Sequence, residues 1–175
     1  MKQHRDSQPA AGPAANPVNR PKNDPWSIRD ARPDDLAVVG RLLQQSDLPA
    51  QGVEDYFNSS YTVAECAGRV IGSVGVETYG RYGLLRSLVV APEWRRKGIG
   101  QTLTDHRLRW ARQHGLSDVF LITVEPTYFA RFGFESVARD PVPQELLNSP
   151  EYPAIRPHSP APLAPAPETS AEDVH

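Results

Sequence analysis

The spacing of hydrophobic residues predicts two amphipathic helices in the central part of the chain. Leu36, Val39 and Leu43 recur at i, i+3 and i+7, and Pro33 precedes them at a position suited to a first helical turn. Pro49 ends this first helix. A second stripe of the same period predicts another helix, and it consists of Gly100, Leu103, Thr104, Leu108 and Ala111. Gly115 follows at a C′ position and ends this helix.

Short runs of β-branched and apolar residues predict the strands of one sheet. The runs YTVAE and RVIGSVGVE flank CAG and indicate a hairpin, and LLRSLVV suits a buried central strand. Further strands are predicted at WSIRDA, DVFLITV and FESVARD, and short helices at VEDYFNSS and PTYFARF. This alternation predicts an α/β or α+β fold with a mixed sheet and helices on both of its faces.

Proline-rich ends delimit a single folded domain. Five of the 18 prolines fall in residues 1–25 and seven in residues 150–175, and both ends are poor in bulky apolar residues. Such segments cannot bury enough surface to offset the entropy lost on ordering. We therefore expect a disordered segment over 1–25, a folded domain over 26–147, and a largely disordered Pro/Ala-rich tail over 148–175.

Composition argues against several classes of partner. A formal net charge of -2 disfavours a general nucleic-acid or membrane-surface binder. The single cysteine, Cys66, allows no intramolecular disulfide, and His106 and His114 lack the carboxylate partners of a metal site. The chain starts without an apolar signal segment and has no apolar run long enough to cross a bilayer. We expect a cytoplasmic protein that binds a small molecule and no metal. Whether it forms a homodimer is left open by the sequence.

The stretch WRRKGIGQTL, residues 94–103, lies between a predicted buried strand and a predicted helix. Free backbone N–H groups and the helix dipole at such a junction suit a phosphate, and glycines let a ligand approach the backbone. Neither a Walker A loop nor a dinucleotide-binding fingerprint fits these residues. A solvated basic turn stays open as the alternative. The expected local basic patch over 95–114 consists of Arg95, Arg96, Lys97, Arg107, Arg109 and Arg112, facing only Asp105.

The longer string LVVAPEWRRKGIGQTL resembles motif A of the GNAT acetyltransferase superfamily, [RQ]-x-x-G-x-[GA], with Arg95, Gly98 and Gly100 at the motif positions. The order of elements and the late string YFARFGFESV extend the resemblance over most of residues 26–147. It implies a GNAT fold whose splayed parallel strands hold acetyl-CoA as cosubstrate. The implied cofactor contacts are Leu88, Val89, Val90, Arg95, Arg96, Lys97, Gly98, Ile99, Gly100, Gln101, Phe129 and Phe132.

The general base of many GNAT members, a glutamate early in the strand before motif A, is missing here. Leu84 and Arg86 occupy those positions, and Glu77 at the end of the preceding strand is the nearest replacement. Ser73 and Gly75 alternate with Glu77 and are small, which predicts open space above that face. A solvated strand end is the alternative for Glu77.

Many members also carry a tyrosine four residues before the late glycine, where it protonates the thiolate. That position holds Phe129, with Tyr128 beside it. Tyr128 is therefore the candidate acid, and a plain packing role is the alternative.

An arginine inside LLRSLVV is costly to bury unless it meets an anion. Arg86 is therefore a candidate clamp for a carboxylate or similar oxyanion of the substrate. Tyr79 flanks this strand and is a candidate to line the same pocket. An internal ion pair of Arg86, for instance with Glu77, is the alternative.

Two GNAT subfamilies are similar to the chain in these strings. FLITVEPTYFARFGFESVARDPVP resembles amino-acid N-acetyltransferases, including the acetyltransferase domain of N-acetylglutamate synthase. GVETYG, LLRSLVVAPEWRRKGIG and GFESVARDPVPQELLNSPEY resemble arsenic-resistance-associated N-acetyltransferases, although this chain reads YPAIRPHSP where those members have a Leu-Cys-Pro-like end. Both resemblances imply a small, anionic, amino-acid-like acceptor: glutamate-like, arsenic-containing or phosphinic. An acetyltransferase for protein N-termini or lysines, and a non-enzymatic CoA-binding protein, remain as alternatives.

Overall fold

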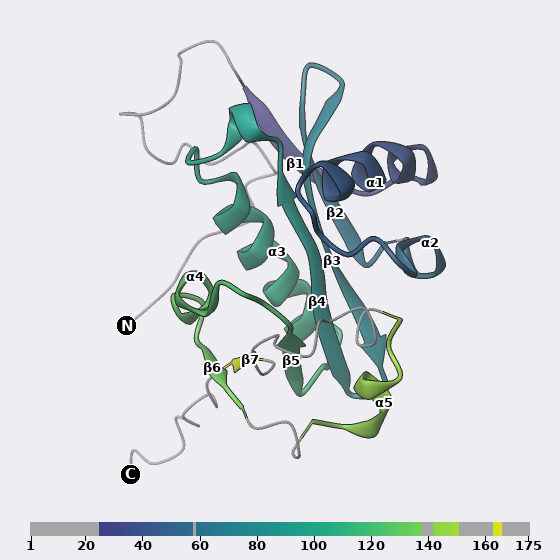
Figure 1. Ribbon diagram of the computed structural model, residues 1–175, viewed down its shortest axis with the longest axis vertical. Helices are drawn as coiled ribbons and strands as arrows, with labels where there is room; N and C mark the ends of the chain where they lie inside the picture. The colour runs from purple at the N-terminus through teal and green to yellow at the C-terminus, as the bar shows by residue number, and fades with distance from the viewer. Residues whose placement is uncertain (1–24, 58, 138–141, 151–162, 166–175) are drawn as a thin grey trace.

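The computed structural model describes residues 25–57, 59–137, 142–150 and 163–165, which build one sheet flanked by helices (Figure 1). The strands are β1 (Trp26–Asp30), β2 (Tyr61–Cys66), β3 (Arg69–Tyr79), β4 (Tyr82–Val90), β5 (Asp118–Leu121), β6 (Phe134–Ser136) and β7 (Leu163–Pro165). The helices are α1 (Leu36–Gln45), α2 (Val53–Tyr56), α3 (Ile99–Gln113), α4 (Pro126–Ala130) and α5 (Gln144–Leu147), with 3-10 turns η1 (Pro33–Asp35) and η2 (Pro92–Trp94). The predicted mixed fold is confirmed.

The strands lie in the order β1-β2-β3-β4-β5-β7-β6. Neighbouring strands are antiparallel except β4 and β5, which run parallel. The predicted β2-β3 hairpin turns at Ala67 and Gly68, whose φ angles of 49° and 76° are both positive. Two consecutive left-handed residues are what a tight hairpin turn with the natural strand twist requires. This parallel pair joins the antiparallel strands β1 to β4 to the C-terminal strands β5, β7 and β6.

Each face of the sheet carries its own hydrophobic core. On one face, Leu103 of α3 belongs to the same buried cluster as Val76 of β3. On the other face, Leu43 of α1 is buried together with Val63 of β2. Figure 1 shows α3 on one side of the strands and α1 and α2 on the other. The sheet is therefore covered on both faces, as the sequence predicts.

Strand β4 contains a bulge at Ser87. Gly75 pairs with Arg86 and Ser73 with Val89, so one residue of β3 faces two residues of β4. Ser87 has a φ of 58°, in the left-handed region, and its carbonyl accepts a hydrogen bond from Ser73 Oγ at 3.0 Å. A bulge bends its strand and re-aims the side chains that follow it. In β4 it lies at the point where pairing with β5 has just ended.

Several elements are shorter than their sequence patterns suggest. Strand β5 ends at Leu121 rather than at residue 124, because the chain leaves the sheet there and Val124 is 79% exposed. Helix α2 stops at Tyr56, and β6 stops at Ser136. The rest of the predicted last strand includes residues 138–141, which lie outside the described residues.

Part of the predicted tail lies against the domain. Ser149 is fully buried, and a side-chain carbon at Gly52 would come within 2.7 Å of Pro150. Strand β7 pairs with both β5 and β6. The N-terminal segment 1–24 and most of the tail lie outside the described residues. In the part of the chain that is described, no helix is long and apolar enough to cross a membrane.

Candidate active site

The candidate site is a cavity that opens where β4 and β5 separate. Their parallel pairing runs from Tyr82↔Asp118 to Leu85↔Leu121 and then stops, whereas β4 continues to Val90. The cavity has a volume of about 1310 Å³ and is lined by the unpaired end of β4, the loop after β5 and the beginning of α3. The edge of β4 that faces it has no neighbouring strand among the described residues. An extended ligand could therefore take the place of one.

The cavity borders the N-terminus of α3. Gly98 precedes the helix with a φ of 79°, and Arg96 in the same loop has a φ of 61°. The first N–H groups of a helix have no intrahelical partner, and here they belong to Ile99, Gly100 and Gln101. All three residues line the cavity. Together with the helix dipole they offer hydrogen-bond donors to a phosphate.

The cations of this loop have different surroundings. Arg95 donates from Nε to the Val90 carbonyl (3.0 Å) and from Nη2 to Ser46 Oγ (3.2 Å). Lys97 Nζ lies 4.4 Å from the ring centre of Trp94, a cation–π distance. Arg95 thus ties the loop to β4 and to the end of α1. Arg95 and Arg96 also line the cavity, so the loop brings cations as well as backbone N–H groups to it.

Tyr128 lines the cavity and reaches the first turn of α3. A side-chain carbon at Gly100 would lie 2.9 Å from the Tyr128 hydroxyl, so only glycine leaves room for this contact. Burial raises the pKa of the Tyr128 hydroxyl, despite opposing effects from Arg131 and a hydrogen bond with Thr104. The hydroxyl is therefore protonated at neutral pH, as a proton donor must be.

The two phenylalanines predicted to contact the cofactor have different positions. Phe129 is 9% exposed and lines the cavity beside Tyr128. Phe132 packs beside the α3-side core and against the Tyr128 ring, with ring centres 5.6 Å apart. Phe132 therefore supports the aromatic wall of the cavity from behind.

Glu77 and Arg86, predicted as base and clamp, contact each other. Arg86 Nη1 lies 2.5 Å from Glu77 Oε1, and neither side chain has any exposed surface. Glu77 Oε2 accepts hydrogen bonds from the Tyr79 hydroxyl (2.7 Å) and from Ser149 Oγ (3.3 Å). Arg86 Nη2 donates to the Gln51 carbonyl at 2.8 Å. The internal ion pair that sequence reasoning left open is the arrangement that the structure has.

The predicted open space above Glu77 is absent. A side-chain carbon at Gly75 would lie 2.3 Å from the Tyr61 ring, because that ring fills the space beside β3. Ser73 is also fully buried. Small residues at these positions make room for a neighbouring side chain of this protein rather than for a substrate.

One member of the predicted basic patch is a core residue. Arg107 has no exposed side-chain surface and lies 3.2 Å from Asp30 Oδ1, with a further bond to the Ser59 carbonyl at 2.9 Å. Burial lowers the pKa of its guanidinium to about 10. Since Arg107 lies four residues from both Leu103 and Ala111, the helical stripe itself carried the signal that this arginine faces inward.

Sequence reasoning missed several polar residues of the site. Asp47, Glu125 and Arg131 line the cavity, and Ser149 and the Gln51 carbonyl bind the buried ion pair. Arg131 lies over the Tyr128 ring, with Cζ 4.7 Å from its centre. Its place three residues after Tyr128, directly after the short helix α4, was a usable signal, whereas no local pattern marks Ser149.

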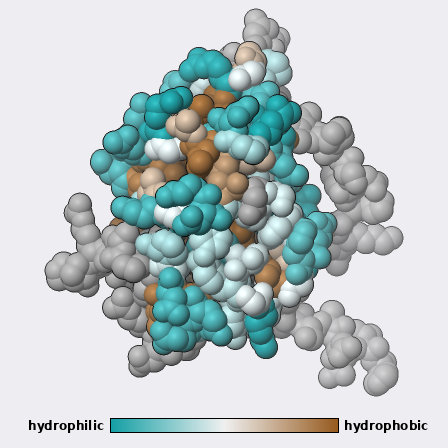
Figure 2. Space-filling model, turned by 90° about the vertical axis from the view of Figure 1, so that its right-hand side faces the viewer, coloured by the Kyte–Doolittle hydropathy of each residue, from teal (hydrophilic) through white to brown (hydrophobic). Residues whose placement is uncertain are grey.

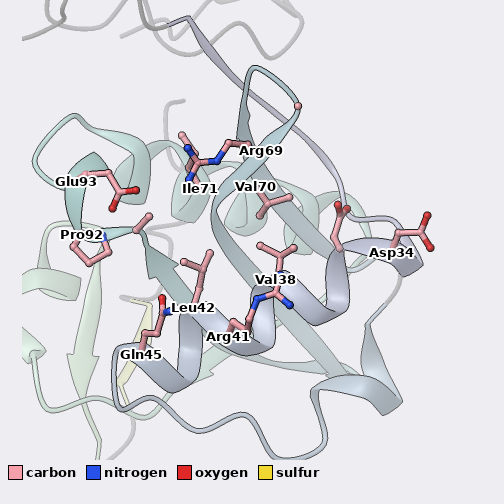
Figure 3. A pocket seen from close by; sticks show the side chains of 13 residues that line it. Asp34, Val38, Arg41, Leu42, Gln45, Arg69, Val70, Ile71, Pro92 and Glu93 are labelled. Atoms are coloured by element: carbon pink, nitrogen blue, oxygen red, sulfur yellow. The ribbon is translucent and has the colours of Figure 1, made fainter.

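A second hollow of about 560 Å³ lies between α1, the β2-β3 turn and η2. Arg41 of α1 and Arg69 of the hairpin flank its apolar floor, which includes Val38 and Leu42 (Figure 3). The α1 and α2 side of the molecule shows hydrophobic atoms between hydrophilic ones (Figure 2). None of the predicted site residues lines this hollow. Among the described residues, no three His, Cys, Asp or Glu side chains form a cluster that could hold a metal ion.

Comparisons with known proteins agree on one family. The model of the "Acetyltransferase (GNAT) family" matches residues 26–134. An uncharacterized N-acetyltransferase of Chlorobaculum tepidum is 27% identical over 126 residues, covering 68% of this chain and 81% of that protein. An amino-acid acetyltransferase of Mycobacterium tuberculosis is 26% identical over 132 residues, covering 69% and 75%.

Solved structures of low identity share the fold. N-acetylglutamate synthase of Neisseria gonorrhoeae, complexed with coenzyme A and L-arginine, superposes with a TM-score of 0.67 at 23% identity over 82% of this chain. The chain spans only 33% of that synthase. A Mycobacterium tuberculosis protein in complex with CoA superposes with a TM-score of 0.66 at 22% identity. That match covers 79% of this chain and 98% of the Mycobacterium tuberculosis protein.

Proposed function

Because the chain belongs to the acetyltransferase (GNAT) family, whose model matches residues 26–134, we propose that it transfers the acetyl group of acetyl-CoA to the amino group of a small, amino-acid-like acceptor. The observation that carries this proposal is the open edge of β4 beside the N-terminus of α3. An edge of unpaired backbone groups suits a pantetheine chain, and free helix N–H groups suit a pyrophosphate.

The two halves of the cavity correspond to the two halves of the cofactor. Leu88 and Val90 would bind the pantetheine through their backbone, with Val89 anchored in the core below. The segment from Arg95 to Gln101 would bind the pyrophosphate, mainly through backbone N–H groups. The thioester would then lie near the bulge at Ser87 and within reach of Tyr128.

The chemistry requires one nucleophilic attack and two proton transfers. The neutral amine attacks the thioester carbonyl carbon, a C–N bond forms, and the C–S bond breaks. We propose the Tyr128 hydroxyl as the proton donor to the leaving thiolate; burial, which raises its pKa, keeps this hydroxyl protonated at neutral pH. The proton lost by the amine passes to water in the open cavity. Glu77 is fully buried with both carboxylate oxygens engaged, which disfavours it as the direct acceptor of that proton.

The acceptor class is supported by the curated relatives, among which is an amino-acid acetyltransferase of Mycobacterium tuberculosis. The cavity is large enough for an amino acid beside the pantetheine arm. Within this class we propose an acceptor with an anionic group: a glutamate-like amino acid, or its phosphinic or arsenic-containing analogue.

A thiol-release assay tests the proposal. The full chain is incubated with acetyl-CoA and, in turn, with glutamate, other amino acids, phosphinic and arsenical analogues, and short peptides with free N-termini or lysines. We expect release of free CoA and an acetylated product with at least one amino-acid-like amine. Acetylation of peptides but of no amino-acid-like amine would show that the acceptor is a protein N-terminus or lysine instead. CoA binding in a titration, with no thiol release for any amine, would reject an enzymatic role.

A further inference from the structure

We propose that the Ser87 hydroxyl, supported by the Tyr61 hydroxyl, accepts a hydrogen bond from the amino group of the acceptor and holds that group for attack on the thioester. This inference rests on the proposed function, since it concerns the same cavity and the same reaction. It assigns a side chain to the amine, whose lone pair has to point at the carbonyl carbon when the C–N bond forms.

The free edge of β4 has a closed end. Parallel pairing with β5 stops at Leu85↔Leu121, so a strand-like ligand that enters from the N-terminus of α3 cannot follow this edge beyond Leu85. Arg86 and Ser87 are the first residues of β4 past the last pair, and both line the cavity. The reactive end of a pantetheine chain on this edge would lie beside them. An attacking amine has to come within about 3–3.5 Å of that end.

Ser87 is the polar group that this part of β4 offers to a ligand. The six residues of β4 that line the cavity are residues 85–90, and four of them are apolar. The guanidinium of Arg86 is taken up by Glu77 Oε1 and by the Gln51 carbonyl. Ser87 is 8% exposed. Its hydroxyl is therefore the side-chain group of β4 that a neutral amine can meet at this point.

The bulge brings Ser87 to the same face of the sheet as Arg86. Gly75 and Glu77 alternate on one face of β3, and the Tyr61 ring lies over Gly75 on that face. Arg86 contacts Glu77 there, and Ser87 contacts Tyr61. Consecutive residues of a regular strand point to opposite faces, whereas a bulge re-aims one of them. The left-handed φ of 58° at Ser87 thus determines where its hydroxyl lies.

Tyr61 holds the Ser87 hydroxyl from behind. The two side-chain oxygens are 3.3 Å apart. Tyr61 is fully buried, and its ring centre lies 5.0 Å from that of Phe57. A hydroxyl has one proton and two acceptor lone pairs. When Ser87 donates its proton to the Tyr61 oxygen, its lone pairs can accept an N–H bond from the amine, and the lone pair of the nitrogen stays free for the carbonyl carbon.

Two serines of the bulge provide a matched pair of variants. Ser87→Ala removes the proposed contact and keeps a residue with a side-chain carbon at the left-handed φ. Ser73→Ala is the control, because Ser73 is fully buried and its Oγ donates to the Ser87 carbonyl at 3.0 Å. Both variants take one hydroxyl from the bulge, and only Ser87 borders the cavity. Urea denaturation checks that both variants are folded.

Steady-state kinetics of the full chain, with an amine identified by thiol release, test the contact. We expect Ser87→Ala to lower kcat/KM for the acceptor about three- to tenfold, the effect of one lost hydrogen bond. Ser73→Ala should stay within about twofold of wild type. Equal losses in the two variants would assign the effect to the bulge as a whole, and an unchanged kcat/KM in Ser87→Ala would remove the contact. Either result would overturn the inference.

Tyr61→Phe tests the supporting hydroxyl. It should lower kcat/KM for the acceptor by no more than Ser87→Ala does, because Tyr61 acts through Ser87. The double variant of Tyr61→Phe and Ser87→Ala should be no worse than Ser87→Ala alone. Fully additive losses would contradict the coupling of the two hydroxyls.

Binding without an amine separates a contact with the acceptor from a contact with the cofactor. The Kd values of Ser87→Ala for CoA and for acetyl-CoA, measured by titration, should both stay within about twofold of wild type. Weaker binding of acetyl-CoA alone would place the hydroxyl on the thioester carbonyl and overturn the inference. If the wild type releases no thiol with any amine, the proposed function fails and this inference with it. An active wild type with an equally active Ser87→Ala variant would reject this inference alone.

Discussion

At the scale of single residues, the site depends on the close approach of Tyr128 to the first turn of α3. Sequence position alone suggested Tyr128 as a general acid, because Phe129 holds the position where many family members have a tyrosine and Tyr128 precedes it directly. The sequence does not show which residue Tyr128 contacts. In the structure its hydroxyl lies so close to Gly100 that a side-chain carbon there would be 2.9 Å away. The motif glycine therefore admits the tyrosine hydroxyl beside the first turn of α3.

Tyr128→Phe should lower kcat about tenfold, less than the roughly 10²–10⁴-fold usual for general acid–base catalysis, because a thiolate is already a good leaving group. The Kd for CoA, measured by titration, should stay unchanged. The raised pKa of Tyr128 also predicts that the wild-type rate does not fall through tyrosine ionisation between about pH 7 and 9. Unchanged kcat in Tyr128→Phe would leave the residue with a packing role only.

Gly100→Ala should displace the Tyr128 hydroxyl and lower kcat to a level similar to that of Tyr128→Phe. In a double-mutant cycle, Gly100→Ala combined with Tyr128→Phe should then be little worse than either single variant, since both remove one interaction. Fully additive losses of kcat would show that the two residues act separately.

At the scale of elements, periodicity predicted α3 because the helix presents one buried face over many residues, and two apolar runs around a turn predicted the β2-β3 hairpin, whose central residues are buried on both faces. It did not predict the bulge in β4. One extra residue in a strand leaves no trace in a pattern of period two when both faces are buried, as they are at the adjacent residues Leu85 and Arg86. The bulge separates the paired half of β4 from the half that faces the cavity, so the element that builds the site is the one that the pattern misses.

Substitutions at Ser87 test the bulge. Ser87→Gly suits the φ of 58° but loses a 3.3 Å contact between Ser87 Oγ and the Tyr61 hydroxyl, so we expect a free energy of unfolding within about 0.5 kcal/mol of wild type. Ser87→Val cannot adopt this backbone easily and should lose about 1–2 kcal/mol. Urea denaturation measures both. Equal stability of the two variants would contradict a left-handed residue at this position.

At the scale of the whole molecule, polar side chains join α3 to the sheet. Arg107 reaches Asp30 of β1, and His106 Nδ1 lies 3.2 Å from Thr62 Oγ1 of β2. The sequence predicted the order of elements from β1 to β6 correctly. It left open whether Arg86 and Glu77 meet each other or a ligand, and Arg107 was assigned to the basic patch, because the ion pairs of these residues depend on tertiary packing. Ser149 illustrates the same limit, since its partner is 72 residues away.

His106 gives stability a pH dependence of known sign. Burial lowers the pKa of His106 below the ordinary 6.5. The positive charges of Arg107 and Arg109 lower this pKa further, and the negative charge of Asp30 raises it. The unfolded chain therefore takes up a proton at a higher pH than the folded protein does, and stability falls as the pH drops below 6.5. Urea denaturation at pH 7 and pH 5 should show a smaller loss in His106→Gln than in wild type. Identical losses of unfolding free energy in His106→Gln and wild type would exclude His106 as a source of the pH dependence.

The position of Trp94 has a spectroscopic consequence. Its half-buried indole lines the cavity next to Lys97, whereas Trp26 is 2% exposed in the core and Trp110 stacks on His114 at 3.9 Å. Of the three indoles, only that of Trp94 borders the cofactor cavity. Entry of CoA should therefore change the fluorescence of one tryptophan over a constant background from two. The chain carries its own optical reporter of cofactor binding, suited to stopped-flow measurement without a label.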